Sequence, residues 1–142
     1  RLDIPRLAEL KTSAKSPVVS IANIPWYVFL QVKPFLDTSN IKQFSIDACC
    51  NEGNKSPHWS CEASVIFSLL SLKVDLKHPS DEQPLHTFCT KEPDWGYPCF
   101  MARKRALDPE NGFLREEDGG VVFEAEITVT KVIGAPVSTL CD

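Results

Sequence analysis

The stretch "WSCEASVIF", residues 59–67, alternates side chains with a period of two along its length. Trp59, Cys61, Ala63, Val65 and Phe67 all fall on one face of an extended chain. Such alternation is typical of a β-strand with one buried face. The stretch therefore predicts a strand that packs one side against a hydrophobic core.

The same alternation recurs in four other stretches, which are "WYVFLQVK" (26–33), "QFSIDACC" (43–50), "LSLKVDLK" (70–77) and "VFEAEITV" (122–129). The apolar positions change parity between Phe67 and Leu70, which predicts a bulge or bend there. Several short strands separated by turn residues are typical of an antiparallel sandwich. We therefore expect an all-β fold.

Turn-forming residues separate the predicted strands. "NEGNKSP" (51–57) is interpreted as a hairpin loop and "HPSDEQP" (78–84) as a longer loop. Only "FMARKRAL" (100–107) has a helical composition, and it is two turns long. The 11 prolines leave no room for a helix of normal length. We expect one domain over residues 1–131, and residues 132–142 as a linker or tail to a domain that is not in this chain.

Composition excludes several functional classes. The chain has 142 residues and a net charge of −4, so a basic nucleic-acid-binding face is not expected. No apolar run approaches the roughly 18 residues of a membrane-spanning helix. The chain begins with Arg, so we expect a fragment of a longer protein, monomeric on its own.

Six cysteines allow either three disulfides or free thiols. The adjacent pair Cys49–Cys50, and Cys141 in the terminal tail, favour free thiols. Cys49, Cys50, His58 and Cys61 form the nearest cluster of metal-ligand types, with His86 and Cys89 elsewhere. Because Cys50 and Cys61 fall on apolar strand faces, we interpret them as core thiols and expect no metal and no cofactor.

The sequence gives no strong sign of catalysis. None of the cysteines begins a credible helix or has a basic neighbour that would lower its pKa. The acids Glu116, Glu117 and Asp118 lie in a Gly-flanked turn, where solvation is the default. The basic run "ARKR" (102–105) is interpreted as a solvated helix face in preference to an anion site.

"EPDWGY" (92–97) places an acid, an aromatic and a glycine side by side as Asp94, Trp95 and Gly96. Pro93 and Gly96 both form turns readily, so one interpretation is a turn that packs Trp95 into the core. The other interpretation is the border of a peptide-binding edge. Local chemistry alone leaves both interpretations open.

Five blocks of the sequence resemble the MATH domain, the meprin and TRAF-C homology module. The blocks are "NIPW" (23–26), "HWSCEASVIF" (58–67), "EPDWGYPCFM" (92–101), "DPENGF" (108–113) and "VVFEAEITV" (121–129). Their order and spacing match the family along residues 1–131. The likeness is strongest to the N-terminal MATH domains of ubiquitin-specific proteases of the herpesvirus-associated type.

This resemblance implies an eight-stranded antiparallel β-sandwich that binds short extended peptides of partner proteins, in the nucleus and cytoplasm. In such proteases the domain recruits substrates with a Pro/Ala-x-x-Ser motif to a separate catalytic domain. By the same resemblance, Asp94 accepts a hydrogen bond from the peptide Ser, Trp95 packs on its Pro or Ala, and Gly96 lets its backbone approach. Glu92 flanks this edge, and Phe35 matches an aromatic near the groove.

One position departs from the family pattern. Ala22 stands where the proteases carry a basic residue that helps to bind the peptide, so we expect a changed preference or affinity. Three other settings of a MATH domain stay open. These are a substrate adaptor with a BTB domain, a TRAF-type signalling scaffold, and an extracellular module of the meprin type.

Overall fold

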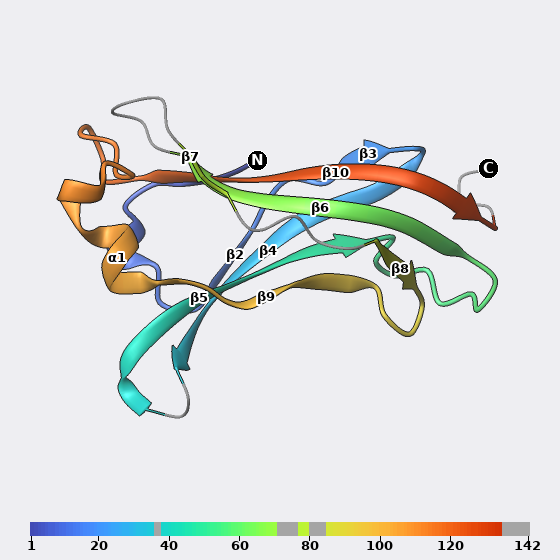
Figure 1. Cartoon of the computed structure of the whole chain (residues 1–142), viewed down its shortest axis with the longest axis horizontal. Helices are drawn as coiled ribbons and strands as arrows, with labels where there is room; N and C mark the ends of the chain where they lie inside the picture. The colour runs from blue at the N-terminus through green and yellow to red at the C-terminus, as the bar shows by residue number, and fades with distance from the viewer. Residues whose placement is uncertain (36–37, 71–76, 80–84, 135–142) are drawn as a thin grey trace.

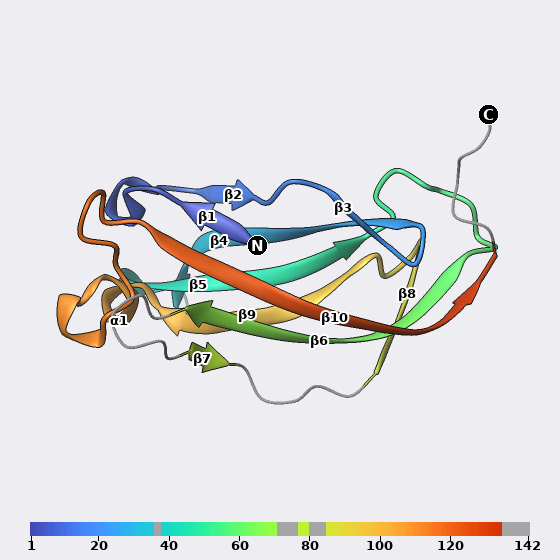
Figure 2. The same ribbon diagram turned by 90° about the horizontal axis from the view of Figure 1, so that it is seen from above.

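The computed structural model describes residues 1–35, 38–70, 77–79 and 85–134, which form two antiparallel sheets facing each other (Figures 1 and 2). The strands are β1 (Leu2–Ile4), β2 (Ser13–Lys15), β3 (Val19–Ile21), β4 (Ile24–Phe35), β5 (Thr38–Cys50), β6 (Ser60–Leu70), β7 (Lys77–Pro79), β8 (His86–Cys89), β9 (Asp94–Ala102) and β10 (Val121–Ile133). The helices are η1 (Leu7–Glu9), α1 (Arg103–Leu107) and η2 (Pro109–Asn111).

Each sheet contains two short strands that share one long neighbour. In the first sheet the order is β1-β10-β6, and β7 and β8 both pair with β6. In the second the order is β2-β4-β5-β9, and β3 also pairs with β4. If each such pair counts as one interrupted strand, the ten segments occupy eight strand positions. The expected all-β sandwich is confirmed.

The core lies between the sheets and is built by the alternating residues of the long strands. All five apolar residues of the stretch 59–67 that alternate in sequence are buried, at 3% exposure or less. Rings from the two sheets meet edge to face, with centroids 5.8 Å apart for Phe44 and Phe123 and 5.0 Å for Trp26 and Phe88. Aromatic pairs of this geometry add stability beyond the area that they bury.

The predicted hairpin at residues 51–57 is wrong. β5 ends at Cys50 in one sheet, whereas β6 begins at Ser60 in the other, so the segment between them crosses the sandwich. β5 and β6 each carry a long apolar face, and both faces are buried because the strands pack across the core rather than side by side. The crossing segment is held by the Trp59 indole N–H, which donates to the Asn54 carbonyl at 3.1 Å.

Two predicted boundaries also differ. Leu69 is fully buried, like every second residue from Trp59 to Phe67. The predicted change of the buried face after Phe67 therefore does not occur up to Leu69. Leu70 ends β6, and residues 71–76 of the predicted strand 70–77 lie outside the described residues. The predicted helix 100–107 is shorter, because Met101 and Ala102 pair with Phe44 and Gln43 and so belong to β9. α1 begins only at Arg103.

Five cysteines lie in the described part of the chain, and all five are free. Cys50 and Cys61 are fully buried, which confirms their interpretation as core residues. Cys141 lies outside the described residues. Across the described ranges, no helix has the length and apolar character that crossing a membrane requires.

Candidate peptide-binding edge

β9 forms one edge of the second sheet, and within the described residues it pairs with β5 alone. The chain enters β9 from a tight turn in which Cys89 and Glu92 exchange two backbone hydrogen bonds, of 3.2 and 3.0 Å. Thr90 in this turn donates its hydroxyl to the carbonyls of Ser56 and Asn54, on the segment that crosses the sandwich. The start of β9 is therefore anchored, while its outer side is an edge.

The pairing register decides which backbone groups of β9 face outward. The Cys50 N–H donates to the Pro93 carbonyl at 2.8 Å, and hydrogen-bonded pairs alternate along an antiparallel ladder. Trp95, opposite Ala48, therefore directs its N–H and C=O toward β5. Asp94 and Gly96 direct theirs away from β5. We call this outward row the β9 edge, and such a row can pair with another extended chain.

Gly96 sits where no side chain fits. A Cβ atom at this position would lie 1.9 Å from the Ile46 carbonyl oxygen and 2.7 Å from the Asp47 Cα. Both contacts are with backbone, so relief would require the strands themselves to move. The glycine therefore keeps β9 close to β5 and leaves the surface beside the β9 edge flat.

Trp95 rests on a second aromatic ring from the opposite sheet. Its indole stacks on the His86 imidazole of β8, with ring centroids 4.2 Å apart and planes 12° apart. His86 in turn meets Phe88 edge to face at 4.5 Å. The Trp95 side chain remains 37% exposed, so the stacked pair closes the side of the sandwich and also presents an apolar surface to solvent.

The outer face next to the β9 edge is acidic. Asp94 is exposed, and Asp47 lies on the same face, opposite Gly96. Burial, and secondly the charge of Asp94, raises the pKa of Asp47, while Lys33 opposes this shift. Burial also raises the pKa of the neighbouring Cys49 thiol to about 11. Asp94 thus offers carboxylate oxygens, strong hydrogen-bond acceptors, beside the outward backbone groups.

Comparison with known proteins fits this architecture, because the family model for the MATH domain matches residues 3–127. The chain belongs to the MATH domain family. BTB and MATH domain-containing protein 38 of Caenorhabditis elegans is 33% identical over 134 residues, which are 94% of this chain and 33% of that protein. Ubiquitin carboxyl-terminal hydrolase 7 of Drosophila melanogaster is 26% identical over 139 residues, which are 98% of this chain and 11% of that protein.

A third relative comes from a plant. TNF receptor-associated factor homolog 1b of Arabidopsis thaliana is 29% identical over 138 residues, which are 90% of this chain and 12% of that protein. The MATH domain thus spans a third or less of each of these three relatives. MATH domains are protein–protein interaction domains and are not themselves catalytic.

The predicted site residues of the MATH domain fall into three groups. Asp94, Trp95 and Gly96 are consecutive on β9, and Glu92 is exposed in the turn just before it. Ala22 is exposed in the β3–β4 turn, separated from β9 by β4 and β5. Phe35 is the last residue of β4. Tyr27 of the same strand pairs with Cys49, which in turn pairs with Asp94, and Phe35 lies eight residues beyond Tyr27, roughly 27 Å along the strand. The Phe35 side chain lies outside the described residues.

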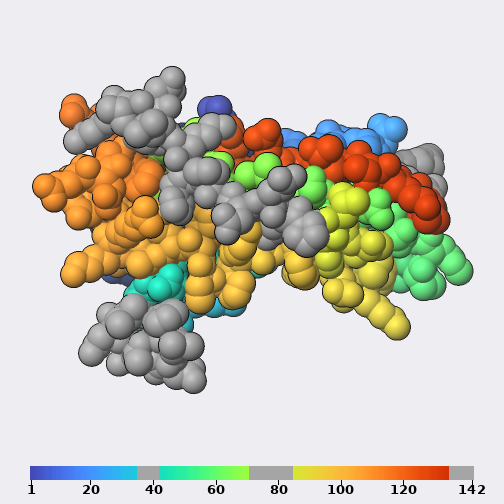
Figure 3. Space-filling view, viewed as in Figure 1, coloured from blue at the N-terminus to red at the C-terminus, as the bar shows by residue number. Residues whose placement is uncertain are grey.

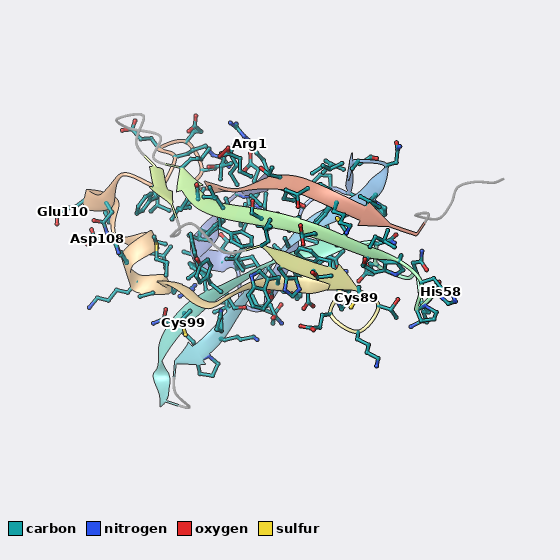
Figure 4. The ribbon with its side chains drawn as sticks, turned by 45° about the vertical axis from the view of Figure 1, so that its right-hand side comes forward. Arg1, His58, Cys89, Cys99, Asp108 and Glu110 are labelled. Atoms are coloured by element: carbon teal, nitrogen blue, oxygen red, sulfur yellow. The ribbon has the colours of Figure 1, made fainter. Side chains whose placement is uncertain are left out.

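Sequence reasoning missed two residues of this region. The sequence marks His86 only as a residue type that can bind metal, whereas in the structure its ring stacks on Trp95. Asp47 lies within the alternating stretch 43–50, and in the structure it shares a face with Asp94. Alternation indicates which residues of this strand are polar, but no pattern within a single strand identifies the partner strand. Figure 4 labels Cys89 at the turn that leads from β8 into β9.

Proposed function

We propose that this MATH domain binds short, extended segments of partner proteins along the β9 edge, with a preference for Pro/Ala-x-x-Ser motifs. The observation that carries this proposal is the outward direction of the Asp94 and Gly96 backbone groups on an edge strand. An added peptide strand gains main-chain hydrogen bonds there, and its alternate side chains meet the surface of the domain.

The side chains around the β9 edge supply the specificity. Asp94 accepts a hydrogen bond from the peptide Ser hydroxyl, and a charged acceptor makes this bond stronger than a neutral one. The Trp95–His86 stack offers an apolar platform for the Pro or Ala residue. Gly96 lets the peptide backbone approach, and the exposed Glu92 flanks the same edge.

The test is calorimetric titration of a Pro/Ala-x-x-Ser decapeptide into the wild-type domain and single variants. Asp94→Ala weakens binding by roughly 1.5–3 kcal/mol, the range for a hydrogen bond to a charged group. Trp95→Ala weakens it by about 2 kcal/mol, as for a buried aromatic anchor. Glu117→Ala, which removes an exposed acid from a loop distant in sequence from β9, leaves the affinity unchanged.

A double-mutant cycle and hydrogen exchange sharpen this test. Replacing the peptide Ser by Ala has little further effect once Asp94 is Ala, because the two groups are partners. Peptide binding also slows exchange of the Asp94 and Gly96 amides, which face the β9 edge in the free domain. Equal affinity of wild type and Asp94→Ala, with no change in exchange of these amides, would refute the proposal.

For the whole protein, two settings are supported by relatives. The first is a ubiquitin-specific protease in which the MATH domain recruits substrates in the nucleus and cytoplasm, in line with the hydrolase relative. The second is a BTB-containing substrate adaptor, favoured by the relative at 33% identity. The coding sequence downstream of Asp142 distinguishes them, because a protease carries conserved Cys and His boxes and an adaptor carries a BTB domain. A fluorescent fusion of the whole protein tests its localisation.

A further inference from the structure

A basic pocket lies at the end of β9 that is remote from Asp94. It is an open cleft of about 730 Å³ between the β5 strand and the segment that contains α1, and it is lined by Lys42, Ala102, Arg103, Lys104, Leu107, Asp108 and Pro109. A volume of this size is in the usual range of ligand-binding pockets. In Figure 3 the residues around α1 form the left end of the molecule, beside β5.

The charge of this pocket is opposite to that of the domain as a whole. Lys42, Arg103 and Lys104 contribute three cations, in a chain with a net charge of −4. In the part of the chain that the structure describes, no ion pair joins these three side chains to an acid. The one acid in the lining, Asp108, already accepts a 3.0 Å hydrogen bond from the Glu110 N–H.

Arg103 has a hydrogen-bond donor without an acceptor. Its Nη2 donates to the Ala8 carbonyl at 2.7 Å, which fixes the guanidinium against the segment before β2. Its Nε is buried and has no partner among the described residues. Buried donors in proteins are nearly always paired, so an unpaired one calls for an acceptor. A carboxylate fits, because a guanidinium binds it through two parallel N–H groups, but the enclosed Nε meets one only when the Arg103 side chain turns toward the pocket on binding.

We propose that the basic pocket binds acidic side chains, Asp or Glu, of a partner polypeptide. The apolar residues Leu107 and Pro109 favour a peptide over a small inorganic anion, because they offer contact area to a side-chain stem. Ala102, the last residue of β9, also lines the pocket, so the pocket lies at the far end of the same strand, beyond the irregular pairing between Tyr97 and Met101. A segment lying along the outer side of β9 would enter it.

The distance between Asp94 and the basic pocket follows from the pairing register of β5 and β9. β5 advances six residues from Gln43, opposite Ala102, to Cys49, opposite Asp94, which is roughly 20 Å. A peptide whose Ser meets Asp94 therefore presents its acidic residues about six or seven positions away. This spacing rests on the proposed function, whereas the occupancy of the pocket by an acidic peptide does not.

The test uses a fluorescent acidic probe, the acetylated peptide Glu-Asp-Leu-Glu-Asp, titrated by anisotropy at low salt. The double variant Lys42→Ala/Lys104→Ala binds it about tenfold more weakly, since two exposed ion pairs are lost. Both side chains are exposed, so the fold is retained. The matched control Lys55→Ala/Lys131→Ala removes two exposed lysines that do not line the pocket and leaves the affinity unchanged.

Two further measurements fix the location and the ligand class. The probe shifts the Arg103 Nε–H resonance in a nitrogen–proton correlation spectrum, as expected for a donor that gains a carboxylate. A probe with Gln and Asn in place of Glu and Asp does not. Equal weakening by both lysine pairs, or an unmoved Arg103 Nε–H, would overturn the proposal. So would inorganic phosphate that displaces the probe at an equal concentration, because the site would then be one for free anions.

The proposal for the basic pocket and the proposal of peptide binding at the β9 edge can be refuted independently. Asp94→Ala leaves binding of the acidic probe unchanged, because Asp94 is at the other end of β9. A Pro/Ala-x-x-Ser peptide extended by seven residues with acidic ends, in either direction, gains affinity only in the domain with Lys42 and Lys104 intact. If no extension gains affinity while the probe still binds, the spacing fails and the pocket assignment stands.

Discussion

At Gly96 the absence of a side chain decides how closely two strands approach. We predict that Gly96→Ala destabilises the domain by about 3 kcal/mol, because the new Cβ meets the backbone of Ile46 and Asp47. Gly53→Ala is the matched control, since its Cβ would meet nothing within 4 Å and only its φ of 89° is unfavourable, a cost of about 1–2 kcal/mol. Urea denaturation measures both. A smaller loss at Gly96 than at Gly53 would contradict the close approach of β9 and β5.

Asp47 gives a pH-dependent prediction at the same place. Burial and the charge of Asp94 raise the pKa of Asp47 in the folded domain, so folding disfavours its charged form. The native state therefore binds this proton more tightly than the unfolded state. The loss of folding stability caused by ionised Asp47 appears as pH rises through the pKa of Asp47 in the folded domain. We predict that Asp47→Asn stabilises the domain at pH 7 and has less stabilising effect near pH 3.

The measurement is the urea midpoint of wild type and Asp47→Asn between pH 3 and 8. Asp3 provides the control of opposite sign, because hydrogen bonding to Arg115 lowers its pKa. Asp3→Asn should lower the midpoint at pH 7 and have less effect in acid. The same pH trend in both variants would contradict the assigned causes.

At the scale of elements, the β3–β4 turn contains a strained residue. Ala22 and Asn23 both have positive φ, of 53° and 63°, which is the geometry of a two-residue hairpin turn. Alanine has an unfavourable energy there, whereas asparagine tolerates it. We predict that Ala22→Gly stabilises the domain by about 1 kcal/mol, with the gain measured by thermal unfolding.

Asn23→Gly is the neighbouring control for this prediction. It should change stability less than Ala22→Gly, because asparagine already adopts this conformation at low cost. If the two substitutions give equal gains, the strain is not specific to the alanine. An unchanged or lower stability of Ala22→Gly would show that the turn does not hold this conformation.

The long strands could be predicted from the sequence because their alternation is a local property. The stretches 26–33, 43–50 and 122–129 lie within β4, β5 and β10. The stretch 59–67 lies within β6 except for Trp59, which directly precedes that strand. The three- and four-residue strands such as β1 and β8 are too short to show a period. The hairpin at 51–57 was predicted wrongly because alternation identifies a buried face but not which strand lies beside it.

The candidate site was predictable to a similar extent. The sequence located Asp94, Trp95 and Gly96 through a family resemblance, and the fold places them on an edge strand. It did not reveal that His86 carries the Trp95 ring, since the two residues lie on different sheets. The basic run 102–105 was interpreted as a solvated helix face, because its contribution to a pocket depends on Lys42, some 60 residues earlier.

At the scale of the whole molecule, burial determines the order in which the thiols are alkylated. We predict that Cys99, which is exposed on β9, is alkylated first among the five described cysteines. Cys89, which is half-buried, reacts next, and Cys49 follows slowly, because it is buried and burial raises the pKa of its thiol to about 11. Cys50 and Cys61 are fully buried and react only on unfolding. Only the thiolate reacts, so both exposure and pKa set the order.

Mass spectrometry of iodoacetamide-treated native protein at pH 7.5 measures this order. The background variant Cys141→Ser restricts the experiment to the five described cysteines. Cys99 lies near the middle of β9 and is labelled on its outer side in Figure 4. Modification of Cys50 or Cys61 before Cys99 in folded protein would contradict the packing of the two sheets.

The position of β10 has a consequence for synthesis on the ribosome. β10 is the last strand among the described residues, yet it lies between β1 and β6 and pairs Phe123 with Leu2. The first sheet therefore cannot assemble until almost the whole domain has left the exit tunnel. Until then the nascent chain carries β6 without its main partner, an exposed apolar strand of the kind that chaperones hold. Translation order, rather than the local propensity of any strand, sets when this sandwich closes.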